Sequence, residues 1–67
     1  MLNKQRARYV IRDTVSGFYV AIDSCRHMFT LVYTKQEAYK FSSENNALRV
    51  VADELCNDTA RYRIEPA

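Results

Sequence analysis

Cys25, His27 and Cys56 are the residues whose types could do chemistry in this chain. Zinc takes about four tetrahedral ligands, so this set leaves one ligand missing, and its spacing fits neither a finger nor a ribbon. A Cys25 nucleophile with His27 as its base is conceivable, because residues two apart on a strand share a face. A chain of 67 residues has little room for the cleft, the oxyanion donors and the orienting group as well. We therefore predict a non-enzyme with no metal and no cofactor.

The cysteine count and the hydropathy pattern indicate the compartment. Two cysteines are too few for the disulfide framework of a small secreted scaffold, so we expect free thiols, with a disulfide as the alternative. No apolar run follows the N-terminal charges, and no run of about 18 apolar residues could cross a membrane. We expect a cytoplasmic protein made of one compact domain, residues 1–67. A chain this short buries only about 60% of its unfolded surface, which predicts marginal stability.

Apolar residues alternate with polar ones over residues 6–13, 18–23 and 27–33, a pattern that predicts three strands. In the first strand the pattern places Ile11 inward, and Val10 outward with the arginines. Gly17 lies between the first two strands and can take the positive φ that a hairpin turn commonly needs. The three strands therefore form an expected meander.

Two capping signals precede helical segments. Thr34-x-x-Glu37 matches a capping box and predicts a short turn, and Ser42 or Ser43 offers a second N-cap for a helix over residues 44–56. In that helix one apolar stripe follows the i, i+3, i+4, i+7 spacing: Leu48, Val51, Ala52 and Leu55. Residues 60–65 alternate again, with Tyr62 and Ile64 inward. The predicted fold class is α+β, a small antiparallel sheet of βββααβ order with one main helix and a short helical turn packed on one face.

Charge separates between the two predicted layers. Residues 34–58 carry three Lys or Arg and five Asp or Glu, whereas the rest of the chain carries seven basic and three acidic residues. The helical layer is thus acidic and the strand layer basic. If the first and last strands pair, five arginines gather on the sheet face that the helices leave open: Arg6, Arg8, Arg12, Arg61 and Arg63.

That basic face has three interpretations. It could be a solvated surface, a patch that binds an acidic protein, or a nucleic-acid platform in which Tyr19 stacks a base between arginines. A net charge of only +2 makes nucleic acid the weaker alternative. Tyr9 and Tyr62 alternate with inward residues and are expected in the core. Tyr19 and Tyr39 lie off the apolar pattern and are candidate exposed anchors for a partner.

Five segments between Tyr9 and about Leu55 form one further pattern: Tyr9-Val-Ile-Arg-Asp13, Gly17-Phe-Tyr-Val20, Phe29-Thr30, Ala38-x-x-Phe41-x-Ser43 and Ala47. With this pattern the chain resembles short phage- and prophage-encoded proteins of uncharacterised function. The resemblance implies no catalytic residues. It does imply a setting in which small proteins bind one host macromolecule and block it.

The function that we expect is therefore that of a small interaction protein which binds or inhibits a host protein with an acidic surface, in the manner of anti-CRISPR and other anti-defence inhibitors. A nucleic-acid-binding module that uses the basic sheet face is the alternative. A homodimer is compatible with either function, because a small core and exposed strand edges favour self-association.

Overall fold

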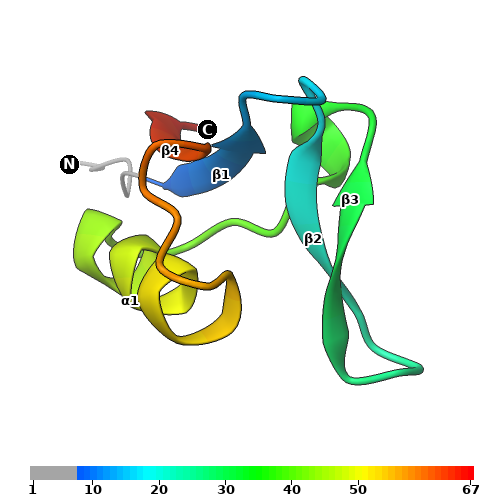
Figure 1. Cartoon of the computed structure of the whole chain (residues 1–67). Coiled ribbons are helices and arrows are strands. Elements are labelled where there is room, and N and C mark those ends of the chain that lie inside the picture. Colours follow the sequence, from blue (N-terminus) through cyan, green and yellow to red (C-terminus); the bar gives the residue numbers. More distant parts are fainter. Residues whose placement is uncertain (1–7) are drawn as a thin grey trace, which may run out of the picture.

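The computed structural model of the chain describes residues 8–67 and contains a four-stranded sheet, one α-helix and one 3-10 turn (Figure 1). Their order confirms the predicted α+β class. The elements are β1 (Tyr9–Asp13), β2 (Tyr19–Asp23), β3 (Met28–Val32), η1 (Lys35–Glu37), α1 (Glu44–Glu54) and β4 (Tyr62–Pro66). None of the helices in the described part of the chain is long and apolar enough to cross a membrane.

The strands are ordered β3-β2-β1-β4, and all neighbours are antiparallel. The expected meander and the expected pairing of the first and last strands are both confirmed. Gly17 adopts a φ of 82°, as its place in the β1–β2 turn predicts. The β1–β4 ladder is long, from Tyr9 opposite Pro66 to Asp13 opposite Tyr62. The β1–β2 ladder contains only the pair of Arg12 and Tyr19.

Beyond that pair β1 and β2 diverge, and the chain between η1 and α1 runs through the opening (Figure 1). The Tyr39 N–H donates to the Val20 carbonyl at 3.0 Å, while Phe41 exchanges two backbone hydrogen bonds with Tyr9 at 2.7 and 2.9 Å. This short segment therefore replaces the missing part of the β1–β2 ladder. It also carries the chain from one side of the sheet to the other.

The main core lies between α1 and one face of the sheet. Ile11, Val20, Phe41, Ala47 and Val51 are buried together. Tyr9, Tyr62 and Ile64 pack around them, as their alternation predicts. The buried face of α1 differs from the predicted apolar stripe, because its buried residues are Ala47 and Val51.

Ala47 replaces Leu48 in the core, because Leu48 is 44% exposed and Ala52 is exposed as well. The predicted helix end at residue 56 is also too late, since α1 ends at Glu54.

A second buried group lies on the other face of the sheet. Val10 and Ala21 alternate with the core residues of their strands, yet they are only 0% and 7% exposed, and Ala38 after η1 is 5% exposed. The prediction of an outward, exposed Val10 is therefore wrong. The reason is η1: its Lys35 reaches Glu65, which lies directly opposite Val10 on β4. The short turn thus covers part of the face that α1 leaves open.

Both predicted caps form. Thr34 Oγ1 accepts from the Glu37 N–H at 3.3 Å and donates to the Glu37 carboxylate at 3.1 Å. Ser43 Oγ accepts from the Asn46 N–H at 3.1 Å at the start of α1. Lys40 Nζ adds a contact that the sequence analysis did not predict, because it donates to the carbonyls of Lys35, Gln36 and Ala38 and so satisfies the end of η1.

Candidate functional site

One row of side chains crosses the sheet on the face opposite α1. Tyr19 lies directly opposite Arg12 on β1, and Arg12 lies directly opposite Arg63 on β4. Directly paired residues of antiparallel strands project to the same side of the sheet. Tyr19 is half-buried, whereas Arg12 and Arg63 are exposed. The structure thus brings together three of the residues that the sequence marks as partner-binding candidates.

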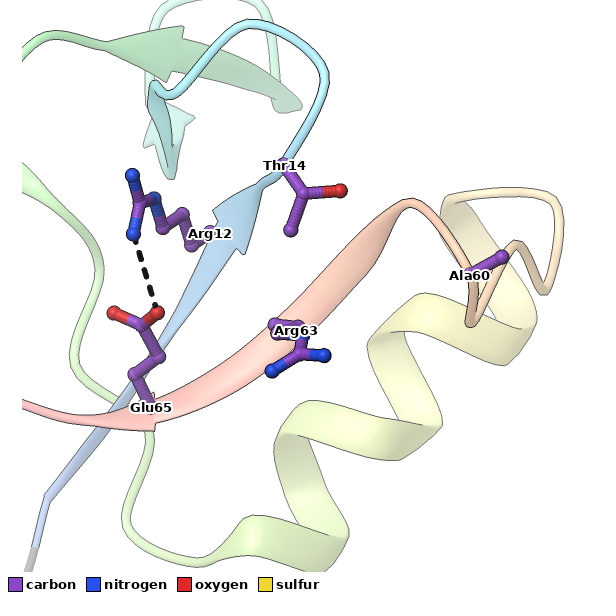
Figure 2. Close-up of a pocket in the computed structure, with 5 residues that line it drawn as sticks. All are labelled: Arg12, Thr14, Ala60, Arg63 and Glu65. Atoms are coloured by element: carbon purple, nitrogen blue, oxygen red, sulfur yellow. Dashed lines mark ion pairs between the residues drawn. The ribbon is translucent and has the colours of Figure 1, made fainter.

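Beside the two arginines the surface forms an open hollow of about 360 Å³, lined by Arg12, Thr14, Ala60, Arg63 and Glu65 (Figure 2). The Arg12 guanidinium turns toward Glu65, with Nη1 3.6 Å from the carboxylate. Glu65 is also 3.9 Å from Lys35 Nζ. Arg63 makes no ion pair within residues 8–67 and projects from β4 beside the hollow.

The charge of this face is positive but moderate. Arg8 belongs to it, because the Ala67 N–H donates to the Arg8 carbonyl at 2.9 Å and extends the β1–β4 ladder by one residue. Arg8, Arg12, Lys35 and Arg63 supply four positive charges around one carboxylate, that of Glu65. Asp23 also projects to this side, at the far end of β2, where it pairs with Arg26. We call these four cations with Glu65 and Tyr19 the basic face. Its two ion pairs are partly exposed to solvent, and such pairs contribute little to stability, so Arg12 is free to change partners.

Arg61 does not lie on the basic face, so the prediction that it gathers there with the other arginines is wrong. Its guanidinium holds Asp13, with Nε 3.0 Å from Oδ1 and Nη2 2.9 Å from Oδ2. Asp13 is fully buried and follows Ile11 in the strand alternation, so Arg61 turns to the side of the sheet where the core lies. Arg61 also sits over the Tyr62 ring, 5.4 Å from its centroid. Arg61 thus links the start of β4 to the end of β1.

The Asp13 carboxylate carries several contacts at once. Besides Arg61, the backbone N–H groups of Val15 and Ser16 donate to Oδ1 at 2.9 and 3.5 Å. The hydrogen bond from Arg61 is the largest effect and holds the pKa of Asp13 well below its usual range, against the opposing effect of burial. The pKa of Arg61 is raised in turn by its bond to Asp13. Sequence reasoning missed this pair, although an Asp opening a turn that ends in Gly17 is a signal for side-chain contacts to the following N–H groups.

The remaining candidates lie elsewhere. Arg6 is outside the described residues. Tyr39 is 44% exposed on the segment between η1 and α1, where its ring stacks edge-on against Phe41 at 4.8 Å, and it does not line the hollow. Glu65 was missed as a site residue. Only the β1–β4 register places it beside Arg12, and no motif in the sequence contains that information.

The Cys25 and His27 geometry differs from the prediction. Both residues lie in the exposed turn between β2 and β3, so the argument that they share a strand face does not apply. Cys25 and Cys56 are both exposed and are not joined by a disulfide. No cluster of three or more His, Cys, Asp or Glu able to hold a metal occurs within residues 8–67.

The fold and the site together define a small α+β domain with a four-stranded antiparallel sheet and a basic face. Comparison with protein-family models, with curated proteins and with solved structures finds no match to this chain. The resemblance to short phage proteins therefore stays a prediction.

Proposed function

We propose that this chain is a non-enzymatic interaction protein whose basic face binds an acidic surface of a partner protein. The observation that carries the proposal is the row of Tyr19, Arg12 and Arg63 across three neighbouring strands. It places two guanidinium groups and one phenol ring on a single rigid surface. Arginine and tyrosine are the residue types enriched where protein partners gain most of their binding energy.

The hollow explains how a partner would be held. Arg63, which makes no ion pair in the described part of the chain, has a guanidinium whose planar fork fits a carboxylate in two hydrogen bonds. Arg12 already lies 3.6 Å from one carboxylate, that of Glu65, which a partner's Asp or Glu would replace. Thr14 adds a hydroxyl at the rim, where it already donates to the Arg61 carbonyl at 2.7 Å.

Glu65 favours a protein over a nucleic acid as the partner. Its carboxylate lies in the middle of the basic face and would repel a phosphate backbone. Nucleic-acid binders usually track several phosphates with a continuous cationic surface. The present face holds four cations interrupted by one anion. The stacking arrangement of Tyr19 beside Arg12 is the observation that keeps nucleic acid as the second candidate.

The finer hypothesis concerns the source of the partner. In the phage setting that the sequence resemblance implies, the partner is a bacterial protein, for example a defence component, and binding blocks it. The experiment is affinity capture from bacterial lysate with three baits: the wild type, Arg63→Glu, and Arg49→Glu as the matched control on exposed α1. We expect a saturable partner that the wild type and Arg49→Glu recover and Arg63→Glu loses.

Two outcomes would overturn the proposal. One is the absence of any saturable protein that distinguishes Arg63→Glu from Arg49→Glu. The other is tight binding of single-stranded DNA or RNA at low salt that falls steeply with added salt and disappears in Arg63→Glu, which would assign the basic face to nucleic acid.

A further inference from the structure

The outer edge of β3 is open. β3 pairs with β2 on one side, and within residues 8–67 no backbone hydrogen bond leads from Met28–Val32 to any other segment. An edge strand of this kind presents a row of unpaired N–H and C=O groups, which is a template for another strand. Nothing in the segment Met-Phe-Thr-Leu-Val blocks such pairing, because it has no charge, no Pro and no Gly.

The opposite edge of the sheet is protected. β4 carries Arg63 and Glu65, and it ends in Pro66, which has no N–H to offer. Lys35 Nζ donates to the Pro66 carbonyl at 3.0 Å and occupies an acceptor there. The contrast between the two edges singles out β3 as the strand that is built to pair.

We propose that β3 pairs antiparallel with β3 of a second copy of this chain, around a two-fold axis that passes between the two Thr30 residues. In this register Thr30 lies opposite Thr30 of the second copy, Phe29 opposite Leu31, and Met28 opposite Val32. Each residue therefore meets one of its own kind, either hydroxyl with hydroxyl or apolar with apolar. Cross-strand pairs of these types stabilise sheets. The pairing joins two four-stranded sheets into one of eight strands.

The apolar surface near β3 supports a second copy of the chain as the partner of this strand. Phe29 and Leu31 lie on the α1 side, because they are paired with Ile22 and Val20 on β2. Leu31 is 39% and Ile22 43% exposed. With Leu55 and Tyr62 this side holds an open apolar pocket of about 120 Å³. In the proposed dimer the two apolar surfaces meet along the axis. On the other face Met28, which is 53% exposed, gains the second copy's Val32 as a neighbour.

Charge does not oppose self-pairing. Continuing the register past the strand ends places His27 opposite Tyr33 and Arg26 opposite Thr34, so no like charges face each other. The contact is short, with five residues from each copy. Interfaces of this small size are weak, so we expect a dissociation constant on the order of 10–100 µM.

The dimer would also change the basic face. Thr30 is paired with Ala21, which alternates with Val20 and so projects to the side of Tyr19 and Arg12. A two-fold axis at Thr30 keeps the same faces of both copies on one side of the joined sheet. Two basic faces then point in one direction, which suits a partner with repeated acidic surfaces. The dimer itself does not depend on the proposed function, because no residue of the basic face takes part in it.

The test is sedimentation velocity of the full chain from about 5 to 500 µM, which brackets the expected dissociation constant. We expect a monomer that becomes a dimer over this range. Thr30→Lys places two like charges on the axis and should weaken the dimer about fivefold or more, while Asn45→Lys on exposed α1 adds the same charge without effect. Circular dichroism checks that both variants keep the fold.

A mixing experiment makes the test specific to this register. Thr30→Lys and Thr30→Glu should each dimerise poorly alone, and an equimolar mixture should form a heterodimer, because opposite charges then face each other on the axis. A chain that stays monomeric throughout the range overturns the proposal. A dimer that is indifferent to the charge at position 30 overturns it too.

Discussion

Arg61 and Asp13 form a two-bond ion pair that joins the end of β1 to the start of β4. The bonds measure 3.0 and 2.9 Å and link residues 48 positions apart. Asp13 is fully buried, and the side chain of Arg61 is 40% exposed. The same junction holds the Arg61 carbonyl, which accepts from the Thr14 N–H at 2.8 Å. A residue expected to bind a partner is thus the residue that closes the sheet.

The first prediction is a loss of stability in acid that comes from Asp13. Its folded pKa lies below the ordinary value of about 3.9, so its contribution is complete above about pH 5 and is lost as the pH falls toward the folded pKa. Denaturant unfolding at pH 7 and pH 3 measures this loss. Asp13→Asn keeps a turn acceptor but cannot titrate, so its loss between the two pH values should be smaller by on the order of 1 kcal/mol. Equal losses in both proteins would contradict the prediction.

Arg61→Ala should reverse the sign of this pH dependence. Without the guanidinium, burial becomes the largest single effect on the Asp13 carboxylate, ahead of each hydrogen bond from Val15 and Ser16, and it raises the pKa. The variant is then destabilised at pH 7 and gains stability as the pH falls through that raised pKa. In the wild type the contribution of Asp13 to the free energy of unfolding stays constant over the same pH range. Unfolding curves between about pH 7 and 4.5 show the difference. Arg26→Ala, which removes an exposed pair with Asp23, is the matched control and should behave as the wild type. If the stability of Arg61→Ala depends on pH no more than that of the wild type, the Arg61–Asp13 pair does not have this electrostatic role.

Cys56→Gly should stabilise the fold. Cys56 follows α1 with a φ of 60°, a left-handed conformation that costs a residue with a Cβ roughly 1–2 kcal/mol. Glycine removes that cost but loses more chain entropy, so we expect a net gain of about 0.5 kcal/mol. Cys25→Gly, in a turn but without positive φ, should give no gain. Thermal unfolding of the two variants measures the contrast, and equal effects would count against the conformational explanation.

Val10→Ala should destabilise the fold more than Leu48→Ala, because Val10 is the more deeply buried residue. Val10 is completely buried, so removing two methyl groups should cost about 2 kcal/mol. Leu48 loses a larger side chain, but it is 44% exposed and should change stability by less than about 1 kcal/mol. The sequence pattern alone predicts the reverse order. Denaturant titration decides between the two.

Local patterns predicted most of the fold. Alternation placed the four strands within two or three residues, because apolar residues on one face of each strand lie in the core or pack against it. The caps at Thr34 and Ser43 were predicted because an N-cap depends only on neighbouring residues. The predicted apolar stripe of α1 begins at Leu48, one residue after Ala47, which is the first buried residue of the helix. Leu48 is the larger apolar residue, but it is 44% exposed, whereas Ala47 is fully buried.

The site was predicted less well, because it depends on long-range register. Alternation correctly placed Arg12 and Arg63 on one face. It could not reveal that Glu65 faces Arg12 or that Arg61 turns toward Asp13, since both contacts require the β1–β4 pairing in three dimensions. Val10 became buried because η1 crosses to its side of the sheet, which no local period encodes.

The central claim is that the basic face binds an acidic protein surface through Arg63. The most direct measurement is surface plasmon resonance of the captured partner against the wild type, Arg63→Glu and Arg49→Glu. We predict that Arg63→Glu weakens binding about tenfold or more, mainly through slower association, while Arg49→Glu binds as the wild type does. Equal affinity of Arg63→Glu and the wild type would contradict the account.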